Sequence, residues 1–102
     1  MNIQQLLDLA RVGARVSSDR ALAQRINLRS IGNISYWRSG KGLPSEDYVI
    51  KLCELAAIKP ELGLIHLNIW RTEGGARTTY IRALKMLEDQ VRGDTRPSVA
   101  AE

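Results

Sequence analysis

Five basic side chains are concentrated in a short part of the chain that holds no acidic residue. They lie between positions 20 and 42 and are Arg20, Arg25, Arg29, Arg38 and Lys41. Guanidinium and ammonium groups gathered in this way suit the phosphate backbone of a nucleic acid. The 102-residue chain has a formal net charge of +4, and its first 59 residues carry nine Lys or Arg against five Asp or Glu. The simpler alternative is an ordinary solvated face whose charge bias arose by chance.

The uncharged residues around these cations are spaced as two short helices joined by a tight turn. Leu22, Ala23 and Ile26 recur at helical spacing and form the buried stripe of the first helix. Ile34 and Trp37 form the buried stripe of the second, which makes Trp37 a core residue rather than a stacking platform. This is the pattern of a helix-turn-helix, in which the second helix enters the major groove of DNA.

Local signals set the ends of these two helices. Ser18 is expected to cap the first, and Asp19 suits the positive end of its dipole. Asn27 is expected to end that helix in the left-handed conformation, which Asn tolerates better than most residues. Ser30 is expected to cap the second helix and Gly40 to end it.

Helical patterns before and after this motif predict an all-α fold. Asn2 and Gln5 are placed for a reciprocal cap on a first helix over about 3–15, which Gly13 weakens and helps to stop. Apolar residues on its buried face are Ile3, Leu6, Leu7, Ala10 and Ala14. No alternating pattern is long enough for a sheet.

The second half of the chain predicts three more helices. Ser45 is expected to cap the fourth, and Pro60 suits the first position of the fifth. The stripe of the fifth helix is Leu62, Ile65 and Ile69. Gly74-Gly75 predicts a hinge before a sixth helix over about 76–91, and residues 93–102 are expected to be a disordered tail.

Few residues offer catalytic or metal chemistry. Cys53 is the single cysteine, which excludes an internal disulfide or a multi-cysteine zinc site. His66 is the single histidine and has no partner at ligand spacing, so we expect it beside the helix-five stripe and no metal. The adjacent Glu46 and Asp47 point in different directions on a helix and complement its dipole. We therefore expect neither an enzyme nor a cofactor.

Residues 19–60 resemble the DNA-binding domain of Cro and the lambda-type phage repressors, a large family of five-helix, helix-turn-helix regulators. The resemblance rests on Leu22-Ala23, Ile34-Ser35, Gly40, Pro44 and the run 50–56. Two features depart from the family pattern, since Asn27 replaces the usual turn glycine and the turn to Ser30 is one residue longer. The register of the second motif helix therefore rests on Ser30, Ile34 and Gly40.

The resemblance implies that the N-terminal half of this helix reads base edges. The matching positions are Ile31, Gly32, Asn33, Ser35 and Tyr36. Asn33 could bind adenine in a bidentate way, and Gly32 would let the backbone approach the groove. Ile31 could touch a thymine methyl group or belong to the core, and Tyr36 could reach a phosphate or pack against the first helix.

Cations around the motif are better suited to binding phosphates than to reading bases. Together with one hydroxyl, the expected phosphate-binding set is Arg20, Arg29, Ser30, Arg38 and Lys41. Arg29 could instead reach into a groove, because it lies in the lengthened turn. The simpler alternative for each cation is a solvated surface charge.

The domain prediction separates a DNA-binding domain at 1–73, with its motif at about 18–40, from a C-terminal helix at 76–92. The apolar face of that helix includes Tyr80, Leu84, Leu87 and Val91. It could fold back onto the first and fifth helices or pair with the same helix of a second subunit. A homodimer suits a near-palindromic double-stranded DNA site, because two-fold symmetry matches two half-sites.

Two functions are consistent with these patterns. The first is a sequence-specific transcriptional regulator, a repressor of the phage or mobile-element type. The second is a protein-interaction module on the same scaffold, such as an antitoxin or adaptor that acts through the C-terminal helix. The chain holds no run of about 18 apolar residues and no signal-peptide layout, so we expect no membrane partner and a cytoplasmic location.

Overall fold

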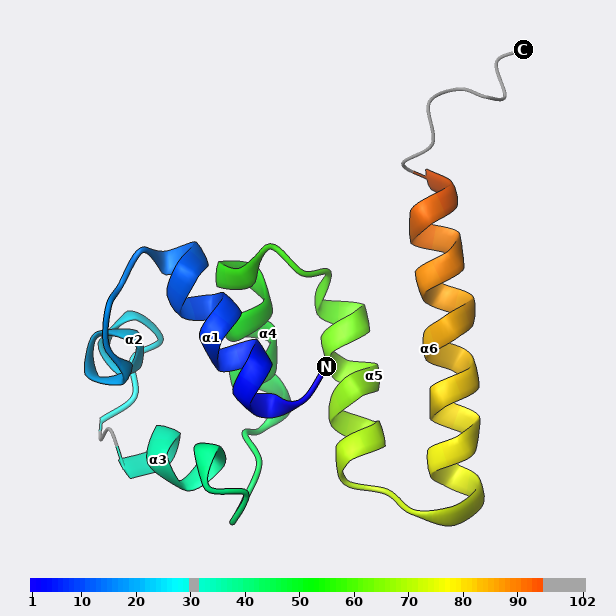
Figure 1. Ribbon diagram of the computed structural model, residues 1–102, viewed down its shortest axis with the longest axis horizontal. Helices are drawn as coiled ribbons and strands as arrows, with labels where there is room; N and C mark the ends of the chain where they lie inside the picture. The colour runs from blue at the N-terminus through cyan, green and yellow to red at the C-terminus, as the bar shows by residue number, and fades with distance from the viewer. Residues whose placement is uncertain (30–31, 95–102) are drawn as a thin grey trace.

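The computed structural model describes residues 1–29 and 32–94, and these form six α-helices and no strand. The helices are α1 (Ile3–Ala14), α2 (Asp19–Arg25), α3 (Gly32–Arg38), α4 (Glu46–Ala56), α5 (Pro60–Trp70) and α6 (Gly74–Asp94). In Figure 1, α2 and α3 lie on one side of the α1–α4 pair, and α5 and α6 lie on the other. The prediction of an all-α fold is confirmed for this part of the chain. None of the described helices is long and apolar enough to cross a membrane.

The hydrophobic core lies where α1 packs against α4, and α2, α3 and α5 close around it. Its fully buried side chains include Leu6, Leu7, Leu22, Ile34, Leu52 and Leu67. All five residues assigned to the two motif stripes are buried, which confirms that part of the sequence prediction. The Trp37 ring centroid lies 5.9 Å from that of Tyr48 on α4, so Trp37 is a core residue as expected.

The starts of the first two helices follow the capping signals. The Asn2 side chain accepts a hydrogen bond from the Gln5 amide at 2.8 Å, and the Gln5 side chain accepts one from the Asn2 amide at 2.8 Å. This is the predicted capping box. The Ser18 hydroxyl accepts a hydrogen bond from the Ala21 amide at 3.1 Å, which confirms Ser18 as the cap of α2.

Four helices end on a residue in the left-handed conformation. These residues are Arg15 (φ 60°), Asn27 (φ 62°), Gly40 (φ 79°) and Ala57 (φ 60°). In each case this residue's amide bonds to the carbonyl three residues back, and the next amide bonds to the carbonyl five residues back, which is the Schellman motif. The expected roles of Asn27 and Gly40 are confirmed.

Gly13 lies within α1 and does not stop it, so that part of the prediction is wrong. The helix continues to Ala14 and ends at Arg15. A β-carbon on Gly13 would lie 1.7 Å from the carbonyl oxygen of Leu55, at the end of α4. Glycine is needed here because the backbones of α1 and α4 touch.

The starts of α4 and α5 match their predictions to different degrees. Ser45 occupies the N-cap position of α4, but its side chain makes no capping hydrogen bond. Pro60 is at the first position of α5, as expected. The negative charges of Glu46 and Asp47 lie in the first turn of α4, where they complement the helix dipole.

α5 is apolar on two sides because it lies between the core and α6. Gly63 faces α4, since a β-carbon there would lie 2.2 Å from the sulfur of Cys53, and Leu67 belongs to the core cluster. The predicted stripe of Leu62, Ile65 and Ile69 falls on the opposite side of the helix. It therefore serves α6 rather than the main core.

α6 runs back alongside α5 in the opposite direction (Figure 1). It begins at Gly74, whose φ of 62° makes the turn, and it continues to Asp94. The helix is thus longer at both ends than expected, and residues 93 and 94 belong to it rather than to a tail. The predicted disorder of residues 95–102 lies outside the described residues. α6 packs along α5, and its pairing with a second subunit stays a prediction.

Candidate nucleic-acid interface

α3 has one buried side and one exposed side. Ile34 and Trp37 point into the core, whereas Asn33, Ser35 and Tyr36 are exposed. The helix is only seven residues long. Isolated helices shorter than about 12 residues are marginal in water, so the orientation of α3 depends on its contacts with the rest of the fold.

A shallow hollow of about 370 Å³ lies on the exposed side of α3. It is lined by Gly32, Ser35, Tyr36, Ser39 and Lys41. The fold thus brings three predicted base-reading residues together with one predicted phosphate-binding residue. The sequence prediction did not include Ser39, although its spacing of four from Ser35 places both on one helix face.

The Tyr36 side chain lies against the loop that follows α3. A β-carbon on Gly42 would lie 2.2 Å from Cε2 of the Tyr36 ring, so the ring covers this glycine. The side chain is nevertheless 52% exposed. This contact differs from the packing against α1 that the sequence left open, and it holds the aromatic ring at the edge of the hollow.

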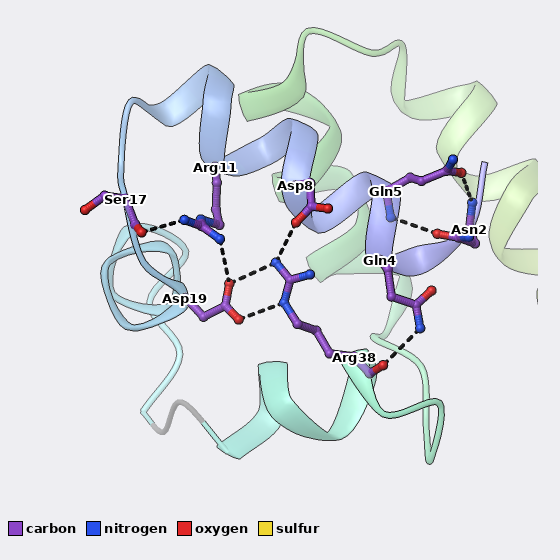
Figure 2. Close-up of polar contacts among 8 residues, drawn as sticks. All are labelled: Asn2, Gln4, Gln5, Asp8, Arg11, Ser17, Asp19 and Arg38. Carbon is purple, nitrogen blue, oxygen red and sulfur yellow. Dashed lines mark hydrogen bonds and ion pairs between the residues drawn. The ribbon is translucent and has the colours of Figure 1, made fainter.

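Arg38, at the end of α3, is held by two carboxylates. Its Nε donates to Oδ2 of Asp19 at 2.7 Å, and its Nη2 donates to Oδ1 of Asp19 at 3.0 Å. The same Nη2 donates to Oδ1 of Asp8 at 2.9 Å, as Figure 2 shows. These contacts raise the pKa of Arg38, chiefly through the hydrogen bonds to Asp19. The guanidinium assigned to phosphate binding therefore faces acidic partners within the protein.

Two further side chains of α1 extend this cluster. The Gln4 amide donates to the backbone carbonyl of Arg38 at 3.0 Å. Arg11 lies 3.9 Å from Asp19 and donates to the carbonyl of Ser17 (Figure 2). The cluster therefore ties the end of α3 to both α1 and the start of α2.

Three other cations of the acid-free segment are exposed. Arg20 lies on α2, Arg29 in the turn and Lys41 after α3. Within residues 1–29 and 32–94, no carboxylate lies at ion-pair distance from any of them. Arg25 is also exposed, and its Nη1 donates to the carbonyl of Ala14 at 3.3 Å. The predictions for Ser30 and Ile31 fall outside the described residues.

The residues proposed for dimerisation lie far from α3, on the other side of the fold (Figure 1). Tyr80, Leu84, Leu87 and Val91 are half-buried along α6. Leu87 and Val91 line a hollow of about 170 Å³ together with residues near the start of α5. The fold therefore separates the candidate groove-facing surface from the candidate subunit contact.

Cys53 and His66, the single cysteine and the single histidine of the sequence, are both buried. Burial raises the pKa of the Cys53 thiol to about 11, so the thiol is protonated at neutral pH. Burial lowers the pKa of His66, whose ring centroid lies 6.0 Å from that of Trp70. In the described part of the chain, no group of three His, Cys, Asp or Glu side chains is placed to hold a metal ion.

Comparison with known proteins finds no family model, no curated protein and no solved structure that matches this chain. We therefore infer function from the residues of α3 and the groups around them. These residues offer hydrogen-bonding side chains on the exposed side of one short helix, with exposed positive charges around them.

Proposed function

We propose that this protein is a sequence-specific, double-stranded DNA-binding transcriptional regulator of the helix-turn-helix class. The observation that carries the proposal is the exposed side of α3, where uncharged hydrogen-bonding side chains are flanked by exposed cations. α2 and α3 are consecutive along the chain and bury their apolar sides in one core. The resemblance of residues 19–60 to Cro and the lambda-type repressors supports the same assignment.

In this proposal α3 enters the major groove, whose width of about 12 Å accommodates one helix. Asn33 presents an amide that can both accept from and donate to adenine, a contact worth about 1–3 kcal/mol against a wrong base. Ser35 and Tyr36 supply hydroxyls to base edges or phosphates. Gly32 leaves the start of the helix without a side chain, so the backbone can lie close to the bases.

Arg20, Arg29 and Lys41 bind phosphates on either side of the groove. They are exposed and face no carboxylate at ion-pair distance in the described part of the chain. Each phosphate neutralised on duplex DNA steepens the plot of log affinity against log salt by about 0.9. Three such contacts in one subunit thus predict a slope of about −2.7 before a second subunit is added.

The regulator acts as a homodimer on a near-palindromic operator, as a repressor of the phage or mobile-element type. α6 is the candidate subunit contact because α5 covers Tyr80, Leu84, Leu87 and Val91 only in part. Two-fold symmetry would place two copies of α3 about one helical turn of DNA apart. The proposal includes no catalytic step and no cofactor.

A protein-interaction module on the same scaffold is the alternative. It is favoured by two large apolar side chains on α6, Ile81 and Met86, which are 49% and 68% exposed. An antitoxin or adaptor would use such a helix to contact another protein. Antitoxins also bind DNA, so this function overlaps with the first.

Selection from a randomised duplex library at physiological salt tests the proposal. The wild-type chain is expected to recover a near-palindromic motif. Asn33→Ala should lose information at one base position of each half-site, whereas the control Gln90→Ala, an amide on α6, should recover the unchanged motif. If wild type enriches no sequence and binds duplex only weakly at low salt, the regulator proposal fails for this chain.

A further inference from the structure

We propose that Arg38 is a positioning residue: held by Asp8 and Asp19, it sets the angle at which α3 presents its outer side to DNA. The consequence for DNA reading rests on the proposed function. The structural part does not, because the orientation of α3 can be measured without DNA.

The geometry of the contact is that of a clamp. Nε and Nη2 of Arg38 donate to the two oxygens of Asp19 at 2.7 and 3.0 Å, which is a bidentate pair. Nη2 of Arg38 also donates to Asp8 at 2.9 Å, and Asp8 lies on α1 whereas Asp19 lies on α2. Gln4 holds the backbone of the same residue through its carbonyl at 3.0 Å. The last residue of α3 is therefore fixed by side chains from α1 and α2 at once.

Apolar burial restrains the rotation of α3 more than its tilt. Ile34 and Trp37 lie on one side of the helix and determine which side faces the core. Two apolar contacts spaced by one turn resist rotation about the helix axis better than they resist tilting. The hydrogen bonds of Arg38 are directional and lie at one end of the helix, so they restrain its tilt directly.

A small tilt is enough to misplace the residues that read bases. Asn33 lies five positions before Arg38, which is about 7.5 Å along a helix that rises about 1.5 Å per residue. A tilt of about 10° about Arg38 would thus move Asn33 by about 1.3 Å, whereas recognition groups must be held within about 0.5 Å. Loss of the clamp should reduce discrimination between sequences more than it reduces binding to DNA in general.

The two possible roles of Arg38, positioning α3 and binding phosphate, predict different effects of Asp19→Asn on DNA binding. Asp19→Asn removes a negative charge and frees the guanidinium. If Arg38 serves to bind phosphate, this variant should bind all duplexes at least as tightly as wild type. If Arg38 is a positioning residue, the variant should lose on the order of tenfold in the ratio of specific to non-specific affinity, the value of one base contact.

The experiment uses the full chain, labelled with ¹⁵N, in four variants. Asp19→Asn and the milder Asp8→Asn weaken the clamp, and Arg38→Lys keeps the charge but cannot form the bidentate pair. Glu61→Gln, an exposed carboxylate at the start of α5, is the matched control for loss of negative charge. Residual dipolar couplings report the angle between α3 and α4, and competition binding reports the affinity ratio for a selected duplex against a scrambled one.

We expect the α3 couplings to change in the three clamp variants and to stay unchanged in Glu61→Gln, with α1 and α4 still folded. Unchanged α3 couplings in both Asp8→Asn and Asp19→Asn would overturn the proposal that Arg38 positions α3, whatever the DNA affinities are. A changed angle with an unchanged affinity ratio would overturn its role in recognition. If wild type itself shows no sequence preference, the proposed function fails, and the couplings still decide the clamp.

Discussion

The carbonyl oxygen of Leu55 occupies the place that a β-carbon would need on Gly13. An ideal β-carbon there would lie 1.7 Å from that oxygen, whereas real β-carbons essentially never lie within 3.0 Å of such a heavy atom. The contact joins the last turn of α1 to the last turn of α4, the pair on which the core is built. No rotamer change can relieve such a clash, because the obstructing atom belongs to the backbone.

We predict that Gly13→Ala destabilises the fold by at least about 2 kcal/mol, because overpacking costs outweigh the gain of about 1 kcal/mol in helix propensity. Gly75→Ala is the matched control, since nothing lies within 4 Å of a β-carbon there. It should leave stability unchanged or raise it by up to about 1 kcal/mol. Urea unfolding measures both, and equal stabilities for the two variants would contradict the close approach of α1 and α4.

We predict that exchanging glycine and alanine at the left-handed positions Gly40 and Ala57 changes the stability of the fold in opposite directions. Both end a helix with the same hydrogen-bond pattern, at φ 79° and 60°. The left-handed conformation costs a residue with a β-carbon about 1 kcal/mol or more. Ala57→Gly should therefore stabilise by roughly 0.5–1 kcal/mol, and Gly40→Ala should destabilise by about 1 kcal/mol. Thermal unfolding of both variants tests this, and a shift of the same sign in both would argue against the shared helix ending.

His66 predicts that stability falls as the pH is lowered below neutrality. Burial lowers its pKa from the ordinary value of 6.5, the N-terminal amino group lowers it further, and Glu88 on α6 opposes them. The unfolded chain therefore takes up a proton at a higher pH than the folded chain does. Stability is fully present above about pH 6.5 and declines as the pH falls through the lowered folded value, by at most about 1.4 kcal/mol per pH unit.

Urea unfolding of wild type and His66→Gln between pH 7.5 and 5.0 measures this dependence. The variant removes the only histidine of the chain and should flatten the profile in that window. A wild-type stability that rises toward pH 5, or one that falls equally in the variant, would show that His66 is not the titrating group.

Much of the helix arrangement could be predicted because its signals are local. The capping box of Asn2 and Gln5, the Ser18 cap and the left-handed Asn27 each depend on neighbours within a few residues. The buried stripes of the motif were also predicted, because the helical period alone decides which residues share a side. The α3 residues that line the hollow were named from the resemblance to Cro and the lambda-type repressors.

Contacts between distant segments could not be predicted. Arg38 belongs to a segment with no acidic residue, but Asp19 and Asp8 reach it from 19 and 30 positions away. The role of Gly13 likewise depends on Leu55, which is distant in the sequence. From the sequence alone, a glycine that lets two helices touch looks the same as one that ends a helix. The sequence prediction missed the second apolar side of α5. Gly63 lies on that side and has no side chain to mark it, and Cys53 packs against its backbone.

Tyr36 and Gly42 predict a functional effect without a large loss of stability. A β-carbon on Gly42 would displace the Tyr36 ring, which is the movable end of an exposed side chain. Gly42→Ala should thus change stability by less than about 1 kcal/mol. It should weaken binding to a selected duplex severalfold, because Tyr36 leaves the edge of the hollow. Tyr36→Phe is the control that keeps the ring and removes the hydroxyl, and unchanged affinity in both variants would exclude Tyr36 from the interface.

The outer side of α3 is the surface that we propose meets DNA. Titration of ¹⁵N-labelled protein with a mixed-sequence duplex at low salt tests it directly, since no operator has to be known. We expect the largest amide shift changes at positions 32–41 and around Arg20 and Arg29, with α6 little affected beyond any subunit contact. Shift changes confined to α6 or to the exposed side of α1, or none up to saturating duplex, would contradict the claim.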